Sequence, residues 1–145
     1  MLRSMKAEKP PTRSSMPRIL LVEDHHSLAA LRCAVLRQQQ YEVVLTGDGE
    51  EACRLLEAEP FDLVVTDSQL SSGSGWEVAR AAKKRRLPVI LSTGWPLRSP
   101  QSRDVDYVLA KPSTMTRFLA LIHTALQKTN STAREMTPVR YRFSK

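Results

Sequence analysis

This 145-residue sequence has few cysteines, few aromatic residues and no long apolar run. Cys33 and Cys53 alone support neither a disulfide framework nor a zinc site, and they suit a reducing cytoplasm. No apolar stretch approaches the length of a membrane span, and the N-terminus lacks the apolar segment of a signal peptide. We therefore predict a single cytoplasmic domain with no membrane partner.

The excess positive charge lies at the two ends of the chain. Of the net charge of +7, residues 1–16 carry +3 and residues 128–145 carry +4, whereas residues 17–127 hold 13 basic and 13 acidic side chains. Basic tails indicate nucleic-acid binding less strongly than a folded domain with a basic face. We predict a neutral domain over 17–127, between a disordered basic extension at 1–16 and a basic tail at 128–145.

Short apolar runs alternate with segments of helical periodicity through this domain. The runs predict strands at 18–23, 41–45, 61–66, 88–92 and 107–110. Helices are expected at about 26–39, 50–58, 76–86 and 114–127. In the first of them Leu28, Leu31, Val35 and the neighbouring alanine and cysteine residues follow helical spacing. Pro96 and Pro100 allow only a short or distorted helix within 94–106. This order predicts an α/β fold, a parallel sheet covered by helices on both faces.

Four of the predicted strands end at polar side chains. Glu23 and Asp24 follow the first strand, Asp67 the third, Thr93 the fourth and Lys111 the fifth. In an open parallel sheet the carboxyl ends of the strands form the binding crevice. Three clustered carboxylates repel one another unless a cation is bound, and oxygen ligands favour Mg²⁺. An aspartate can attack phosphorus, while an ammonium and a hydroxyl can hold the phosphoryl oxygens. The set predicts phosphoryl transfer to an aspartate.

The chain resembles the receiver domains of bacterial two-component response regulators over about residues 17–127. Four motifs carry the resemblance: ILLVED (19–24), DLVVTD (62–67) followed by Gly75, VILST (89–93), and Lys111-Pro112. The resemblance implies a flavodoxin-like, doubly wound sheet of order 2-1-3-4-5, an order for which receiver proteins are an established example. It also implies a cis Lys111–Pro112 bond, which the energetics of X-Pro bonds permit.

The resemblance assigns a role to each site residue. Asp67 would accept phosphate from a histidine kinase or phosphotransfer protein. Mg²⁺ (or Mn²⁺) would bind Asp24, Asp67 and the backbone carbonyl of Gln69, with Glu23 supporting it directly or through water. Lys111 would pair with the carboxylate or phosphate, and Thr93 would move towards the phosphoryl group on activation.

Two departures from the family pattern concern the switch that reports phosphorylation. Val108 stands where the family usually has an aromatic residue, three positions before Lys111. Tyr107 is adjacent, but neighbouring strand residues point to opposite faces of a sheet. The usual Met-Pro after the acceptor strand is Leu70-Ser71. The coupling of Thr93 to a rotating aromatic is therefore an open question at this stage.

We interpret the chain as a stand-alone phosphoacceptor, a monomer or weak homodimer and not an enzyme, that signals through a downstream protein target. The alternatives are a phosphorylation-independent adaptor with the same fold and a nucleic-acid binder that acts through its basic tails. An aspartate-nucleophile phosphohydrolase is disfavoured, because Gln69 stands where such enzymes have a second acid.

Overall fold

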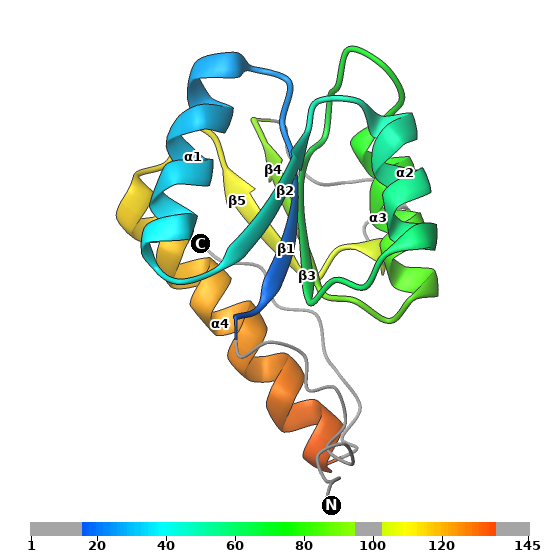
Figure 1. Ribbon diagram of the computed structural model, residues 1–145, viewed down its shortest axis with the longest axis vertical. Helices are drawn as coiled ribbons and strands as arrows, with labels where there is room; N and C mark the ends of the chain where they lie inside the picture. Colours follow the sequence, from blue (N-terminus) through cyan, green and yellow to red (C-terminus); the bar gives the residue numbers. More distant parts are fainter. Residues whose placement is uncertain (1–15, 95–102, 136–145) are drawn as a thin grey trace, which may run out of the picture.

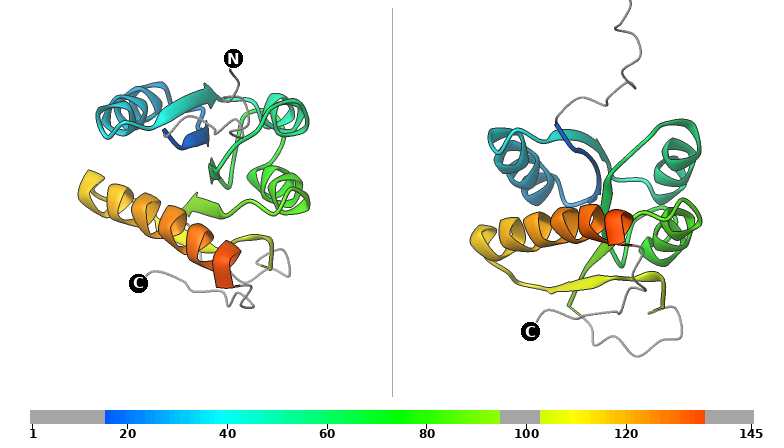
Figure 2. Two further views of the ribbon diagram at one scale, coloured as in Figure 1. Left: turned by 60° about the horizontal axis from the view of Figure 1, so that its bottom comes forward. Right: turned by 90° about the horizontal axis from the view of Figure 1, so that it is seen from below.

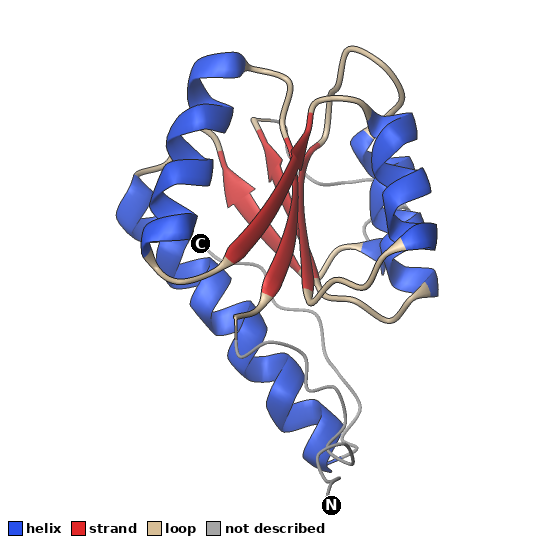
Figure 3. Cartoon of the chain, viewed as in Figure 1, coloured by secondary structure: helices blue, strands red, loops and turns tan. Residues whose placement is uncertain are grey.

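The computed structural model describes residues 16–94 and 103–135, with side chains as far as residue 128. Its five strands form one parallel sheet of order β2-β1-β3-β4-β5, which confirms the predicted fold class (Figure 3). In chain order the elements are β1 (Arg18–Val22), α1 (His26–Gln38), β2 (Glu42–Thr46), α2 (Gly49–Ala58), β3 (Leu63–Asp67), α3 (Gly75–Lys84), β4 (Val89–Thr93), β5 (Tyr107–Ala110) and α4 (Met115–Glu135).

Two helices cover each face of the sheet. Figure 1 shows α1 and α4 on one side of the strands and α2 and α3 on the other. Strand side chains alternate between the faces, so Ile19 and Leu21 join the α1–α4 core while Leu20 and Val22 join the α2–α3 core. The two further views in Figure 2 show the same sandwich, with the sheet between the helical layers.

The helices of this sandwich begin at polar side chains that accept backbone N–H groups. Asp48 accepts from Glu50 at the start of α2, and Ser74 accepts from Trp76 at the start of α3, at 2.8 and 3.0 Å. At the start of α1, His25 Nδ1 accepts from Leu28 at 3.3 Å. His25, Asp48 and Ser74 thus end the loops that follow β1, β2 and β3 and fix where each loop joins its helix.

The buried face of α1 differs from the predicted one. Leu31 is 49% exposed, and Leu28 and Val35 are half-buried. The residues that face the sheet are Ala29, Arg32, Cys33 and Leu36. The small residues of the predicted pattern are thus buried, as Ala29 and Cys33, whereas its larger side chains are not, and Arg32 and Leu36 complete the buried face.

The last helix extends beyond its predicted end at residue 127. It continues to Glu135, so residues 128–135 of the predicted tail are helical (Figure 1). Residues 128–135 contain neither glycine nor proline, and the first proline after them is Pro138. No sequence signal therefore stops the helix at 127.

Some expectations fall on residues outside those described. The extension at 1–16 is described only at Met16, and residues 136–145 of the tail are not described. Of the predicted fourth helix, 95–102 lie outside the described residues, while Arg103 and Asp104 adopt 3-10 geometry. Within the described ranges, no helix has the length and apolar character needed to span a membrane.

Candidate functional site

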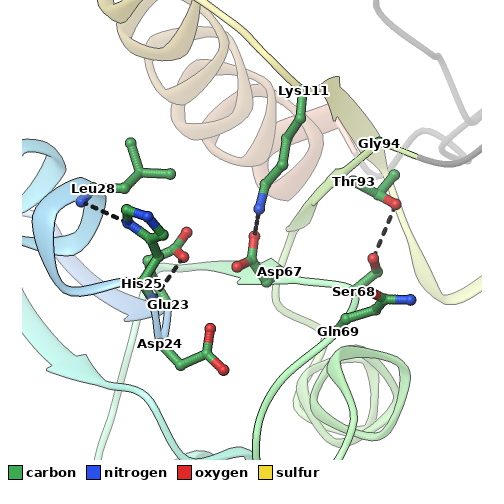
Figure 4. Close-up of a pocket in the computed structure, with 10 residues that line it drawn as sticks. All are labelled: Glu23, Asp24, His25, Leu28, Asp67, Ser68, Gln69, Thr93, Gly94 and Lys111. Carbon is green, nitrogen blue, oxygen red and sulfur yellow. Dashed lines mark hydrogen bonds and ion pairs between the residues drawn. The ribbon is translucent and has the colours of Figure 1, made fainter.

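The carboxyl ends of β1, β3, β4 and β5 border a cleft of about 450 Å³ (Figure 4). The strand register accounts for this, because it pairs Val22 with Thr66, Asp67 with Ser92 and Thr93 with Ala110. The residue that ends each strand or follows it therefore lies at one edge of the sheet. Among the described residues, those that line the cleft are Glu23, Asp24, His25, Leu28, Asp67, Ser68, Gln69, Thr93, Gly94 and Lys111.

Three carboxyl groups meet in this cleft. Glu23, Asp24 and Asp67 each offer an oxygen that lies within 4.8 Å of the other two. Glu23 and Asp67 are only 3% and 4% exposed. Burial raises the pKa of Glu23 to about 7, and the hydrogen bond and charge of Asp67 add to the shift. Such a concentration of negative charge suits a divalent cation with oxygen ligands.

Asp24 is held in its charged form by the loop that follows β3. The hydroxyl and the backbone N–H of Ser71 both donate to Asp24 Oδ2, at 2.6 and 2.7 Å. These hydrogen bonds, the hydroxyl one first, lower the pKa of Asp24. Asp24 is thus a charged, half-exposed carboxylate of the acidic cluster that can serve as an oxygen ligand for a cation.

Lys111 reaches Asp67 from the end of β5. Its Nζ lies 2.8 Å from Asp67 Oδ1, and Figure 4 shows the two side chains pointing towards one another. The Lys111–Pro112 peptide bond is cis, as predicted. A primary ammonium at this distance offsets part of the carboxylate charge and is placed to contact any group bound to Asp67.

Thr93 is already engaged in a hydrogen bond at the other side of the cleft. The hydroxyl of Ser68, directly after Asp67, donates to Thr93 Oγ1 at 2.9 Å (Figure 4). Gln69 follows Ser68 along the cleft wall and pairs with Ser74 through a backbone bridge. The fold therefore brings together all the predicted acceptor and metal-site residues in one cleft.

A family model for the response regulator receiver domain matches residues 19–123 of the chain. The chain belongs to the response regulator receiver domain family. Members of this family accept a phosphoryl group on an aspartate, bind Mg²⁺ at an acidic pocket and interact with histidine kinases.

Relatives of known sequence and structure agree with this assignment. The transcriptional regulatory protein PdtaR of Mycobacterium tuberculosis is 30% identical over 122 residues, which cover 79% of this chain and 60% of PdtaR. The response regulator TrrA of Thermotoga maritima, solved with Mg²⁺–BeF, is 27% identical at a TM-score of 0.71, covering 77% of this chain and 100% of that chain. The receiver domain of the sensor histidine kinase PA1611 of Pseudomonas aeruginosa, solved with magnesium in its active-site cleft, is 27% identical at a TM-score of 0.68 and covers 78% of this chain and 99% of that one.

Among the curated relatives that match first, this chain spans between 12% and 60% of the relative's own length. The matched part is the receiver domain in this chain. The activities of the longer relatives outside that domain therefore do not transfer to it.

The two neighbouring residues considered for the predicted switch, Tyr107 and Val108, lie on opposite faces of β5. Tyr107 is buried in the α1–α4 core, and Val108 packs against the α2–α3 core. This agrees with the alternation predicted for neighbouring strand residues. Tyr107 therefore does not occupy the space in which an aromatic residue at position 108 would lie.

Sequence reasoning missed three residues around the receiver cleft. Ser68 donates a hydrogen bond to Thr93, and Ser71 donates one to Asp24. Arg32 Nη1 lies 3.4 Å from Glu23 Oε1. Burial lowers the pKa of the Arg32 guanidinium. The one available signal was the position of Arg32 in α1, three residues after Ala29 and four before Leu36, where a core residue is expected.

Proposed function

We propose that this chain accepts a phosphoryl group on Asp67 from the phosphohistidine of a histidine kinase or phosphotransfer protein. The observation that carries the proposal is the ion pair between Lys111 and Asp67 inside a cleft that also holds two further carboxylates. An aspartate that is 4% exposed and within reach of both an ammonium and a cation site is suited to nucleophilic attack on phosphorus.

The transfer exchanges one bond to phosphorus for another. A carboxylate oxygen of Asp67 attacks the phosphorus atom, and the bond to the donor's imidazole nitrogen breaks with its electron pair passing to that nitrogen. Lys111 stays close enough to hold an oxygen of the transferred group. Thr93 Oγ1 accepts the hydrogen bond from Ser68, so contact between the Thr93 O–H and the same group does not require that this bond break.

The residues present fit a Mg²⁺ ion. Asp24 and Asp67 would hold it together with the Gln69 backbone carbonyl, and Glu23 would support it directly or through water. The bound ion would neutralise charge on the carboxylate and on the incoming phosphoryl group. The magnesium found in the cleft of the PA1611 receiver domain and the Mg²⁺–BeF bound to TrrA support this assignment.

Incubation with Mg²⁺ and a small-molecule phosphodonor, followed by intact-protein mass spectrometry, tests the proposal. The wild type should gain the mass of one phosphoryl group, and Asp67→Asn should gain none. Asp62→Asn is the matched control, because Asp62 lies just before the opposite end of β3 and accepts the Arg18 N–H. A gain that survives Asp67→Asn, or no gain by the wild type, would contradict the proposal.

The second candidate is the phosphorylation-independent adaptor, and Val108 is the observation that favours it. With a small side chain in the α2–α3 core at this point, the usual aromatic readout of phosphorylation is missing. The adaptor predicts that a downstream protein binds Asp67→Asn as strongly as it binds the phosphorylated wild type. Stand-alone action stays a prediction, and so does nucleic-acid binding through the basic tails. The same binding assay on protein without the tails tests whether they contribute.

A further inference from the structure

Arg32 is a buried cation that has no role in the phosphotransfer step proposed above. It lies in α1 and is 2% exposed. Its Nη1 is 3.4 Å from Glu23 Oε1, and both terminal nitrogens are 3.5 Å from the Ser92 hydroxyl. The guanidinium carbon is 4.7 Å from the centre of the Phe118 ring. The positive charge thus approaches the acidic cluster from the α1 side of the sheet.

These contacts are poor ones for a purely structural salt bridge. Distances of 3.4 and 3.5 Å lie beyond the usual range of hydrogen bonds. Within the described part of the chain, Arg32 Nε has no hydrogen-bond partner. Burying a guanidinium is costly unless it is well paired, and its neighbours Cys33, Leu36 and Phe118 form an apolar site. An apolar side chain would fill this position at lower cost, so stability alone does not account for Arg32.

The charge balance of the cleft is what Arg32 changes. Glu23, Asp24 and Asp67 carry three negative charges when ionised, and Lys111 offsets one of them. Arg32, paired with Glu23, offsets a second, so the formal charge is −1 instead of −2. A cation fixed beside a ligand carboxylate repels a divalent ion and competes with it for that carboxylate.

We propose that Arg32 is a positioning residue that pairs with Glu23, weakens divalent-cation binding and makes the Mg²⁺-loaded cleft attractive to the phosphoryl group. With Mg²⁺ bound, the formal charge of the cleft is +1, whereas it would be 0 without Arg32. Arg32 therefore lowers the affinity of the cleft for the cation and raises its affinity for the anion. This inference rests on the proposed function, since it requires a cleft that takes both Mg²⁺ and a phosphoryl group.

Isothermal titration calorimetry with Mg²⁺ alone, and then with beryllofluoride at saturating Mg²⁺, tests the inference. Beryllofluoride is an anionic analogue of the phosphoryl group. The variants are Arg32→Met, which removes the charge and keeps a flexible side chain, and Arg32→Lys, which keeps the charge. Arg37→Met is the matched control, because Arg37 is an exposed arginine of the same helix and bonds the Val43 carbonyl.

The two ligands should respond to Arg32→Met in opposite directions. At about pH 8.5, where carboxyl groups are charged, Arg32→Met should bind Mg²⁺ at least about tenfold more tightly than the wild type does. Beryllofluoride should bind about tenfold or more weakly. Arg32→Lys should stay closer to the wild type than Arg32→Met for both ligands, and Arg37→Met should change neither affinity by more than about twofold.

The outcomes separate this inference from the proposed function. Mg²⁺ binding that is equal in the wild type and Arg32→Met, or changes of both affinities in the same direction, would overturn the role of Arg32 and leave the Mg²⁺ site standing. A wild type that binds no Mg²⁺ would overturn both. Should Arg32→Met not fold, the NMR signal of Arg32 Nε–H in the wild type decides: it should move as Mg²⁺ is added, and an unmoved signal would overturn the inference.

Discussion

Gly75 is the point at which helix α3 touches the strand end that carries Asp67. Its N–H donates to the Ser68 carbonyl at 3.1 Å. A Cβ at this position would overlap the backbone oxygen of Asp67 and lie 2.7 Å from the Asp67 carbonyl carbon and 2.8 Å from Ser68 Cα. These are backbone atoms of a buried strand end, which no side-chain rotation can move. Gly75→Ala must therefore displace either α3 or the end of β3.

The cost of Gly75→Ala follows from this overlap. Adding a methyl group to a packed core typically costs about 1 to 3 kcal/mol, and a contact with backbone belongs at the upper end, about 3 kcal/mol. For a domain of this size, that loss lowers the melting temperature by roughly 10 °C. Urea denaturation and thermal unfolding measure both quantities. Gly94→Ala is the matched control, because apart from its chain neighbours no atom of the described residues lies within 4 Å of its added Cβ. Its stability should change by less than about 0.5 kcal/mol.

The same displacement should reach the acidic cluster. Asp67 is one of its three carboxylates, so Gly75→Ala should also weaken Mg²⁺ binding in calorimetry. If Gly75→Ala is as stable as Gly94→Ala, the contact between α3 and β3 is looser than the distances indicate. If it is destabilised but binds Mg²⁺ like the wild type, α3 moves and β3 does not, and the coupling of Gly75 to Asp67 is refuted.

Two further predictions concern pH and helix capping. Because burial raises the pKa of Glu23 from 4.5 to about 7, its contribution to folding is present below pH 4.5 and is lost as the pH rises through 7. In urea denaturation with a metal chelator, the wild type should therefore lose about 2 to 3 kcal/mol more than Glu23→Gln does between about pH 5 and pH 8, and parallel curves would contradict the shift. Ser74 accepts the Trp76 N–H at the start of α3, so Ser74→Ala should cost about 1 kcal/mol of unfolding free energy, whereas Ser74→Asp should retain most of it.

The fold and the composition of the cleft could be predicted because both depend on regular features of the sequence. Runs such as 61–66 end at a polar residue, and parallel strands bring those ends to one edge whatever the details of packing. The sequence therefore predicts that Asp67, Thr93 and Lys111 share one cleft, and all three line it in the structure. Element ends moved by one or two residues, except where α4 continues to Glu135.

The buried face of α1 could be predicted only in part from apolar periodicity, which includes Ala29 and Cys33 but not Arg32. Arg32 is charged, and a charged residue in a helix is normally placed towards solvent. Its burial places the guanidinium 3.4 and 3.5 Å from Glu23 and Ser92 at the end of the sheet, and a helical pattern does not show such neighbours, which are far apart in the sequence. The Ser68–Thr93 hydrogen bond was missed for the same reason, since it depends on the pairing of β3 with β4.

In the proposed function, phosphate acceptance and signal readout rest on different parts of this receiver domain. Acceptance needs groups within contact distance of Asp67, and the strand ends supply Lys111 and the acidic cluster. Readout through an aromatic side chain needs a space beside β5 that the side chain can fill or leave. Val108 lies on the α2–α3 side of β5 and Tyr107 on the α1–α4 side, so a rotation of Tyr107 stays within the other core. Since strand alternation fixes these faces, Tyr107 cannot replace the missing aromatic without a shift in the register of β5.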